Sequence, residues 1–263
     1  MNTEKTIKNQ AKKLLEGNWT TVITAVIVLC VVLIFVQSIS YAAMFACGIF
    51  DLNTFEVKDS GKLIYALISA GGYLILFLLS PMLNGVYKII CNTAVSGSCE
   101  ISDLGYFFKK GRYLKTLFVN FFVFAIFGIF CMLFNIYGYA SYFLDGILKE
   151  NPSFDIIKNI LLVLSGVVTA VLTVLAYLVL VHYQLLAYAL DDNMPAAKYC
   201  FGFYAFSCRN LGAAIKLMCG FIGWIVLCFF VVPAFYVLPY LMTSMAVSAK
   251  WLFAIDRNRG LLC

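Results

Sequence analysis

The polar side chains most suited to chemistry in this apolar chain gather near a single histidine. His182 is the only histidine, Gln184 follows it closely, and Asp191 and Asp192 end the same apolar run. A titratable side chain inside a long apolar run is a functional candidate, because its burial in hydrocarbon is costly. His182 therefore has two interpretations: a structural hydrogen bond to a neighbouring helix or to water, and a role with a proton or a substrate.

The acidic pair Asp191 and Asp192 also has two interpretations. The pair could bind a divalent cation or act as general acid and base, but it lacks the further ligands that such chemistry uses. Because Asp-Asp-Asn stands directly before Met-Pro, the simpler interpretation is a polar cap that ends a helix at the inner membrane surface. The ten cysteines contain no C-x-x-C pair, so we predict no metal site.

Two asparagines lie inside other apolar runs. Asn84 follows Pro81 at three residues, and Asn120 lies near the start of the next apolar run. Proline frees a backbone carbonyl, and asparagine side chains form hydrogen bonds between membrane helices. Interhelical contact is the first interpretation of Asn84 and Asn120, and the lining of a substrate cavity is the alternative.

Catalytic motifs are absent from the sequence. It contains no H-E-x-x-H, no G-x-S-x-G, no Walker loop and no cluster of carboxylates within the apolar runs. We therefore expect no catalytic residues, no cofactor and no enzymatic activity.

The elements that position these residues are membrane helices. Of the 263 residues, 63% are hydrophobic and 12% are charged, against roughly 45–50% and about 25% in soluble domains. Runs without Asp, Glu, Lys or Arg cover residues 17–50, 63–87, 116–144, 159–190 and 217–249. Each exceeds the roughly 20 residues that cross a bilayer as a helix. The runs do not alternate in polarity as barrel strands do, so we predict an all-α, polytopic membrane helix bundle.

We expect one integral membrane domain, residues 1–263, with six spans. The last apolar run contains Pro233 and Pro239 in VVPAFYVLPYL, and as one helix it would be about twice as long as the bilayer core is thick. A turn at 233–238 divides it and places fifteen of the nineteen Lys and Arg residues on the inner side. Both termini are then cytoplasmic. The expected spans are residues 20–46, 63–90, 113–135, 157–188, 211–232 and 239–255.

Short amphipathic segments precede the spans on the inner side. Residues 3–16 place apolar residues on one helical face and lysines elsewhere, which is typical of an interfacial helix. Residues 101–113 and 194–212 are similar, and each segment is followed by two spans, so the spacing favours three repeated hairpin units. Anionic lipid headgroups are the expected partner of the basic residues, and nucleic acid is not. The candidate headgroup contacts are Lys12, Lys13, Lys109, Lys110 and Arg112.

Five segments give the chain a resemblance that covers nearly its whole length. In order, they read AKKLLEGNW, LSPMLNGVYKI, YALDDNMPAAKY, CGFIGWIVLC and LPYLMTSMA. The chain resembles a family of uncharacterised integral membrane proteins, found mainly in Gram-positive bacteria and defined as a domain of unknown function. The resemblance implies a membrane domain of several spans and no activity.

The sequence leaves two classes of function open. The first is a non-catalytic protein of the bacterial cytoplasmic membrane that organises or regulates a process at the lipid interface. The alternative is a small-solute or lipid transporter or flippase, which Pro81, the polar residues in the spans and the repeated hairpins favour. A sealed apolar core favours the first class, and a water-filled cavity that reaches Asn84 favours the second.

Overall fold

The computed structural model describes residues 3–50, 57–148, 155–228 and 231–258, and these residues are almost entirely helical. Within them there is no β-strand, and one isolated bridge joins Phe50 to Val57. The all-α prediction is confirmed. The α-helices are α1 (Thr3–Leu15), α2 (Trp19–Ala46), α3 (Lys62–Leu79), α4 (Pro81–Ser96), α5 (Tyr113–Leu133), α6 (Ile136–Leu148), α7 (Asp155–Tyr177), α8 (Tyr183–Leu190), α9 (Phe203–Cys219), α10 (Ile222–Leu227) and α11 (Val231–Asn258). The 3-10 helices are η1 (Asp59–Gly61) and η2 (Ile101–Phe108), and the π-helical turns are η4 (Leu178–His182) and η5 (Lys198–Gly202).

Five helical segments are long and apolar enough to cross a membrane, as expected of a multi-pass membrane protein. They are Trp19–Ala46, Asp59–Ser96, Tyr113–Leu144, Ile156–Leu190 and Pro233–Asp256. Large apolar side chains are exposed along most of these segments, for example Ile34, Leu67 and Val163. Lipid is the solvent that such surfaces fit.

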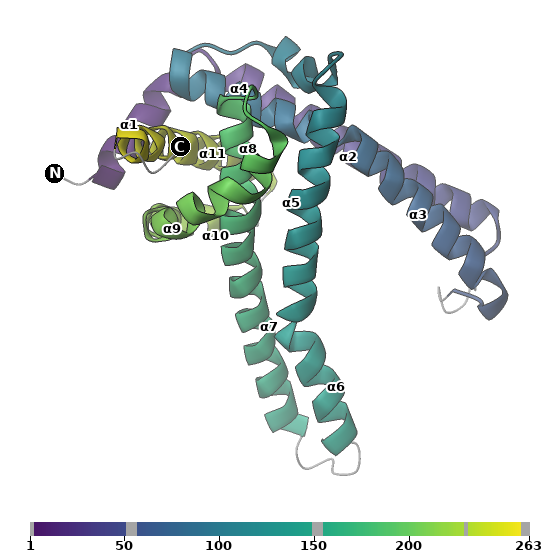
Figure 1. The fold of residues 1–263 in the computed structure, drawn as a ribbon. Coiled ribbons are helices and arrows are strands. Elements are labelled where there is room, and N and C mark those ends of the chain that lie inside the picture. Colours follow the sequence, from purple (N-terminus) through teal and green to yellow (C-terminus); the bar gives the residue numbers. More distant parts are fainter. Residues whose placement is uncertain (1–2, 51–56, 149–154, 229–230, 259–263) are drawn as a thin grey trace.

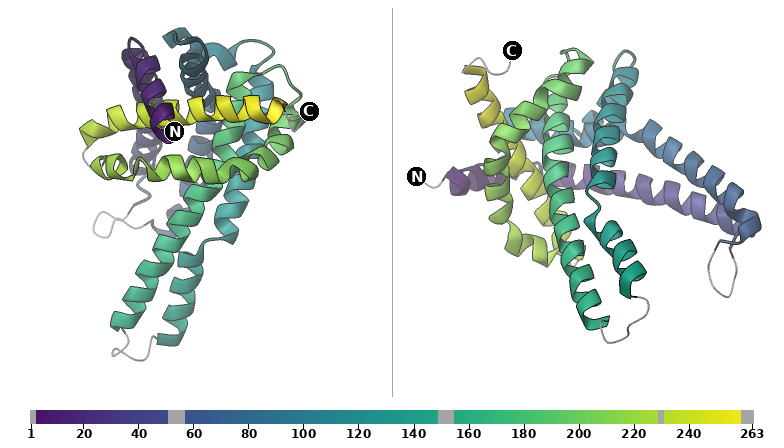
Figure 2. Two further views of the ribbon diagram at one scale, coloured as in Figure 1. Left: turned by 90° about the vertical axis from the view of Figure 1, so that its left-hand side faces the viewer. Right: turned by 60° about the horizontal axis from the view of Figure 1, so that its bottom comes forward.

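The helices form three hairpin arms that leave a common hub in different directions (Figure 1). The first arm pairs α2 with α3, the second pairs α5 and α6 with α7, and the third pairs α9 and α10 with α11 (Figure 2). We define the hub as α1, α4, η2, η4 and α8 with the adjoining ends of the arms. Both ends of the described chain lie on the hub side of the molecule rather than at the tips of the first two arms.

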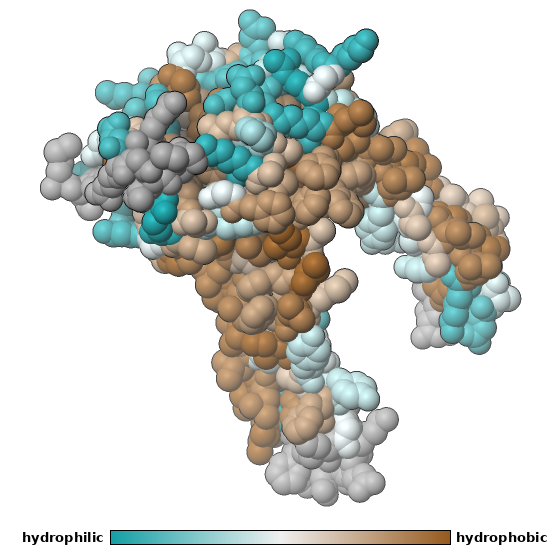
Figure 3. All heavy atoms as spheres, viewed as in Figure 1, coloured by the Kyte–Doolittle hydropathy of each residue, from teal (hydrophilic) through white to brown (hydrophobic). Residues whose placement is uncertain are grey.

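The main core lies in the hub rather than along the arms. Helix α4 buries ten of its residues, whereas α3, which continues into it, buries only Gly72. Helix α8 buries seven consecutive residues, Tyr183 to Ala189, because α4, α9, η4 and η5 surround it. Hydrophilic residues gather over the hub, and hydrophobic residues cover the arms (Figure 3).

Local sequence explains how the helices of the hub begin and end. Pro81 opens α4, where its fixed φ suits the first turn and its missing N–H is not needed. Gly97 ends α4 with φ +74°, a left-handed conformation that favours glycine. Asn18 then joins two helix ends, because its Nδ2 donates to Leu14 O at 2.9 Å and to Gly97 O at 2.8 Å.

The tightest packing in the hub lies between α4 and η2. A Cβ atom at Gly85 would lie 2.2 Å from the carbonyl oxygen of Leu104, which is closer than real contacts allow. Only glycine therefore lets η2 lie directly on α4. Phe107 of η2 is fully buried beside it and stacks on Tyr188 with ring centroids 5.0 Å apart.

The first amphipathic segment is helix α1, and its apolar face contacts protein. Ile7, Ala11 and Leu15 are buried, because α1 packs on α11 and α4. Just beyond α1, the Trp19 ring stacks on Tyr236 of the third arm with centroids 4.7 Å apart. The third arm thus covers the apolar face of α1, and the position of this helix among lipid headgroups stays a prediction.

The predicted turn at residues 233–238 is wrong. Helix α11 runs unbroken from Val231 to Asn258 and includes Pro239. Pro233 lies in the first turn, where backbone N–H groups have no partner within the helix, so its missing donor is not needed there. The chain still reverses, but it does so between the end of α10 at Leu227 and the start of α11.

Other predicted spans differ from the helices in detail. The span predicted at 63–90 is divided between α3 and α4 at Ser80, and α7, η4 and α8 together cover 157–188. Between the spans predicted at 113–135 and 157–188, the residues Ile136–Leu148 form helix α6. The span predicted at 211–232 is interrupted at Gly220 and Phe221, between α9 and α10. Six spans and a repeat of three units stay predictions.

Candidate functional site

The polar core of the hub begins with the two predicted asparagines, which lie in contact. Asn84 of α4 donates from Nδ2 to Oδ1 of Asn120 on α5 at 2.9 Å, and both residues are fully buried. Asn120 in turn donates from Nδ2 to Oγ of Ser80 at 2.8 Å. This chain of side-chain bonds joins α5 to the point where α3 meets α4. Its geometry is that of an interhelical contact.

His182 contacts α4 one helical turn beyond Asn84, at Tyr87. Its Nδ1 is 2.9 Å from the hydroxyl of Tyr87, which is 2.8 Å from the hydroxyl of Tyr177. Asn84 and Tyr87 are three residues apart on α4, so they lie on the same side of that helix. His182 ends the π-helical turn η4, and such turns are frequent at functional sites. Among the described residues, its Nε2 has no hydrogen-bond partner.

Gln184 does not join this network. It is fully buried on α8, and neither oxygen nor nitrogen of its amide finds a partner within the described chain. Oδ1 of Asn84 is also without a partner among those residues. Buried polar atoms in this state are ordinarily satisfied by ordered water. The described residues hold no group of three or more His, Cys, Asp or Glu that would suit a metal ion.

The predicted acidic pair lies on the surface of the hub at the end of α8. The backbone N–H of Asp191 bonds to Ala187 O, and its side chain accepts from the N–H of Asn193 at 3.0 Å, which ends the helix. Asp192 has a different role, because Oδ2 pairs with Nε of Arg112 at 2.7 Å. The two carboxylates thus serve separate partners.

Tyr106 is the centre of a cap of basic residues around Asp192. Its hydroxyl donates to the Asp192 carboxylate at 3.4 Å. The guanidinium of Arg112 lies 4.3 Å from the ring centroid, and the ammonium groups of Lys88 and Lys109 lie at 5.1 Å and 5.6 Å. Cations at such distances are attracted to the face of an aromatic ring. We call these five residues the Tyr106 cap.

Two lysines point into the hub and satisfy backbone carbonyls at the end of α8. Lys88 donates to Ala189 O at 2.8 Å. Lys115 donates to Asp192 O and, at 2.7 Å, to Met194 O. Ala189 O is among the last carbonyls of α8, which have no partner within the helix and carry partial negative charge, so the cation of Lys88 is favourable there. Sequence reasoning counted these lysines only as inner charges.

Protonation around the cap is fixed by these contacts. The hydrogen bond with Asp192 raises the pKa of Arg112, which stays charged. Burial raises the pKa of Tyr106, and the Asp192 carboxylate raises it further. Burial also raises the pKa of Tyr199, whose hydroxyl donates to Asp191 O. Both tyrosines therefore remain hydroxyl donors at neutral pH.

The remaining predicted headgroup contacts are exposed on the hub. Lys12 and Lys13 lie on the open side of α1, and Lys109 and Lys110 lie in the turn before α5. In the described ranges, none of these four ammonium groups has an acidic partner within salt-bridge distance. They are free to meet an anion from outside the protein.

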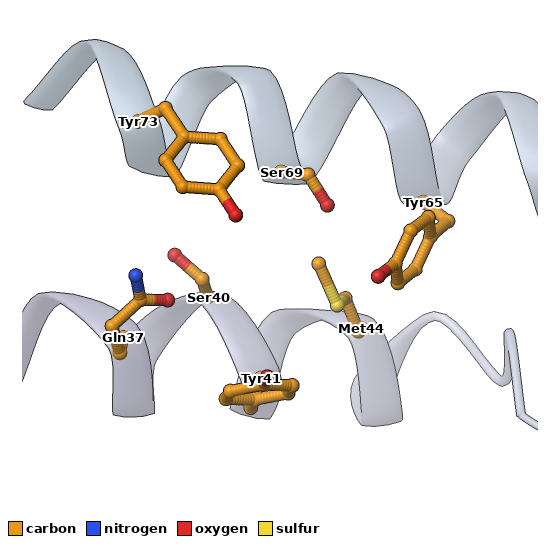
Figure 4. Close-up of a pocket in the computed structure, with 7 residues that line it drawn as sticks. All are labelled: Gln37, Ser40, Tyr41, Met44, Tyr65, Ser69 and Tyr73. Carbon is orange, nitrogen blue, oxygen red and sulfur yellow. The ribbon is translucent and has the colours of Figure 1, made fainter. Parts of the chain in front are cut away.

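A separate polar seam runs between α2 and α3 in the first arm. A cavity of about 40 Å³ lies there, with room for a water molecule. Figure 4 shows hydroxyl and amide groups of both helices turned toward this space. It is lined by Gln37, Ser40, Tyr41, Met44, Tyr65, Ser69 and Tyr73. The cavity does not include Asn84, so the predicted polar residues of the hub do not line it.

Comparisons with known proteins do not add a name to these sites. No family model, curated protein or solved structure matches the chain. Its resemblance to a family of membrane proteins in Gram-positive bacteria stays a prediction. The Tyr106 cap and the polar core are therefore interpreted from their own chemistry.

Proposed function

We propose that this chain is a non-catalytic multi-pass protein of the bacterial cytoplasmic membrane that organises or regulates a process at the lipid interface. In this proposal the hub and both termini face the cytoplasm, and the three arms make six passes. The chain is also proposed to belong to the family that its sequence resembles. No cofactor or nucleic acid takes part.

The position of the exposed lysines carries this proposal. Lys12 and Lys13 on α1 and Lys109 and Lys110 before α5 are distant in sequence, yet all lie exposed in the polar hub from which the apolar arms leave. Basic residues at a membrane surface contribute about 1 kcal/mol each to the attraction of anionic lipid. The hub therefore has the charge that anchors it to an anionic leaflet.

Native mass spectrometry of the purified protein with phosphatidylglycerol or phosphatidylcholine tests the proposal. We expect wild-type protein to retain more phosphatidylglycerol, and the variants Lys12→Gln/Lys13→Gln and Lys109→Gln/Lys110→Gln each to retain less. The matched control is Lys58→Gln/Lys62→Gln, which removes two lysines near the tip of the first arm. Equal retention of phosphatidylglycerol by all three double variants would contradict the proposal.

Transport of a small solute or a lipid is the second candidate. The observation that favours it is the line of hydroxyls from half-exposed Tyr177 through Tyr87 to buried His182, whose Nε2 is unpaired among described residues. Flux or lipid exchange in vesicles decides between the candidates. Transport above that of empty vesicles, lost in Tyr87→Phe, would replace the first proposal.

A further inference from the structure

Arg112 presents an unused fork of hydrogen-bond donors at the surface of the hub. Its Nε is bound to Asp192 at 2.7 Å, and its guanidinium lies on the Tyr106 ring at 4.3 Å. Neither of its terminal Nη nitrogens has a hydrogen-bond partner within the described residues, and 39% of its side chain is exposed. An arginine held on one side and open on the other is prepared for an oxyanion, because its parallel N–H groups match two oxygens at once.

Lys109 belongs to the same turn before α5 as Arg112. The N–H groups of Arg112 and Tyr113 both bond to Lys109 O, at 3.1 Å and 3.3 Å. Gly111 makes the turn possible with φ +88°. The ammonium group of Lys109 has only the Tyr106 ring as a partner among described residues, at 5.6 Å. The turn therefore brings the charged groups of both Lys109 and Arg112 within 6 Å of the Tyr106 ring centroid.

Positive charge exceeds negative charge around Tyr106, where Asp192 bonds to the hydroxyl and Asp103 is a second carboxylate close enough to act on the ring. Lys88, Lys109 and Arg112 surround the ring, and Asp192 is the one carboxylate that bonds to the ring hydroxyl. Three cations within 6 Å of one ring centroid repel one another, and a further anion beside the two carboxylates would relieve this repulsion. The ligand must therefore be negative.

We propose that Arg112 and Lys109 form a binding site for a phosphate group above Tyr106. A tetrahedral phosphate accepts bonds from both terminal nitrogens of Arg112 and places a third oxygen toward the ammonium of Lys109. This site rests on the proposed function and adds to it the chemical group that one basic surface of the hub would bind. Exposed Phe108 and Leu114 flank the two cations, so a phosphate that carries acyl chains also finds apolar contact.

Binding of three probes to purified full-length protein tests the site. The probes are short-chain phosphatidylglycerol, inorganic phosphate and short-chain phosphatidylcholine, whose choline group cancels the phosphate charge. We expect Lys109→Gln to weaken phosphatidylglycerol binding by about tenfold, as for the loss of one charge-assisted hydrogen bond. The matched control is Lys110→Gln, which removes a neighbouring charge without a contact to Tyr106 and should change affinity less than about twofold.

The outcomes separate the source of the phosphate from the existence of the site. Binding of phosphatidylglycerol alone assigns the site to lipid, and binding of inorganic phosphate as well assigns it to the phosphate group itself. Equal losses in Lys109→Gln and Lys110→Gln would overturn the site and leave a diffuse basic surface, which the proposed function still allows. Binding that neither variant changes would overturn the site as well.

Arg112 is tested by a conservative variant, because its truncation would also release the Asp192 carboxylate. Arg112→Lys keeps a cation near Asp192 but lacks the fork of donors. We expect it to lose phosphate affinity at least as strongly as Lys109→Gln, with little change in the thermal midpoint. A variant that binds phosphatidylglycerol as tightly as wild type would show that the fork is not used.

Discussion

The side chains of Asn84 and Asn120 form a hydrogen bond of 2.9 Å between α4 and α5, and both residues are completely buried. The loss of stability differs between removing one side chain of such a pair and removing both. Removal of one partner leaves a buried amide without its bond, whereas removal of both leaves an apolar contact. The pair therefore fixes how α5 of the second arm meets α4 of the hub.

Asn120→Leu is the first prediction. We expect a loss of about 1–3 kcal/mol in unfolding free energy, because Nδ2 of Asn84 keeps only its long bond of 3.5 Å to Ser80 O in a buried site. The double variant Asn84→Leu/Asn120→Leu should lose less than the sum of the two single variants. Thermal unfolding in detergent measures both effects, with exposed Asn9→Leu as the control. Strict additivity would show that the two amides do not interact.

Gly85→Ala is the second prediction. Its Cβ would meet the backbone of Leu104 at 2.2 Å, so η2 must move away from α4. We expect a loss of about 1–3 kcal/mol, as for other overpacked cores. The control is Gly105→Ala on η2 itself, where a Cβ meets nothing within 4 Å. Similar thermal midpoints for the two variants would mean that η2 does not pack on α4 as closely as described.

Periodicity and composition predict much of this fold. Several helix boundaries lie close to those predicted from the apolar pattern: α1 ends at Leu15, α2 ends at Ala46 and α5 begins at Tyr113. These boundaries follow from local chemistry, such as the break at Gly17 and the long runs without charge. Such local signals can be read from a single sequence.

Contacts between segments that are distant in the chain cannot be predicted from a single sequence in this way. Asn84 and His182 stand out in sequence as polar residues in apolar runs, but Tyr87, which bonds to His182, is 95 residues away from it. Tyrosine is frequent in this chain, so nothing marks Tyr87. Similarly, no sequence signal distinguishes Lys88 and Lys115, which point inward, from Lys109 and Lys110, which are exposed.

The two prolines of the last apolar run explain why the turn predicted at residues 233–238 does not form. A proline resists helix continuation in general, but it fits the first turn of a helix and is tolerated in membrane helices. Pro233 is in the first turn of α11, and Pro239 lies inside it. The bias of basic residues predicts a reversal of the chain without fixing the residue at which it occurs.

Tyr87→Phe is the third prediction. It removes the hydroxyl that lies between Tyr177 and His182, so Nδ1 of His182 loses its only hydrogen-bond partner among the described residues. We expect a loss of about 1–3 kcal/mol, measured as a lower thermal midpoint in detergent. Tyr142→Phe, at a residue that is 86% exposed on the second arm, is the control. No difference between the two variants would show that water replaces the hydroxyl.

The final prediction concerns the third arm, whose two sides meet between Leu227 and Val231. A dual topology reporter fused after residue 263 should give a cytoplasmic signal, because the chain enters and leaves this arm at the hub. Control fusions at residue 51, which follows α2, and at residue 145, near the end of α6, should give external signals. An external signal after residue 263 would mean that α9 to α11 cross the membrane once. The third arm would then be no membrane hairpin, the chain would have five passes, and the three arms could not be equivalent units of a repeat.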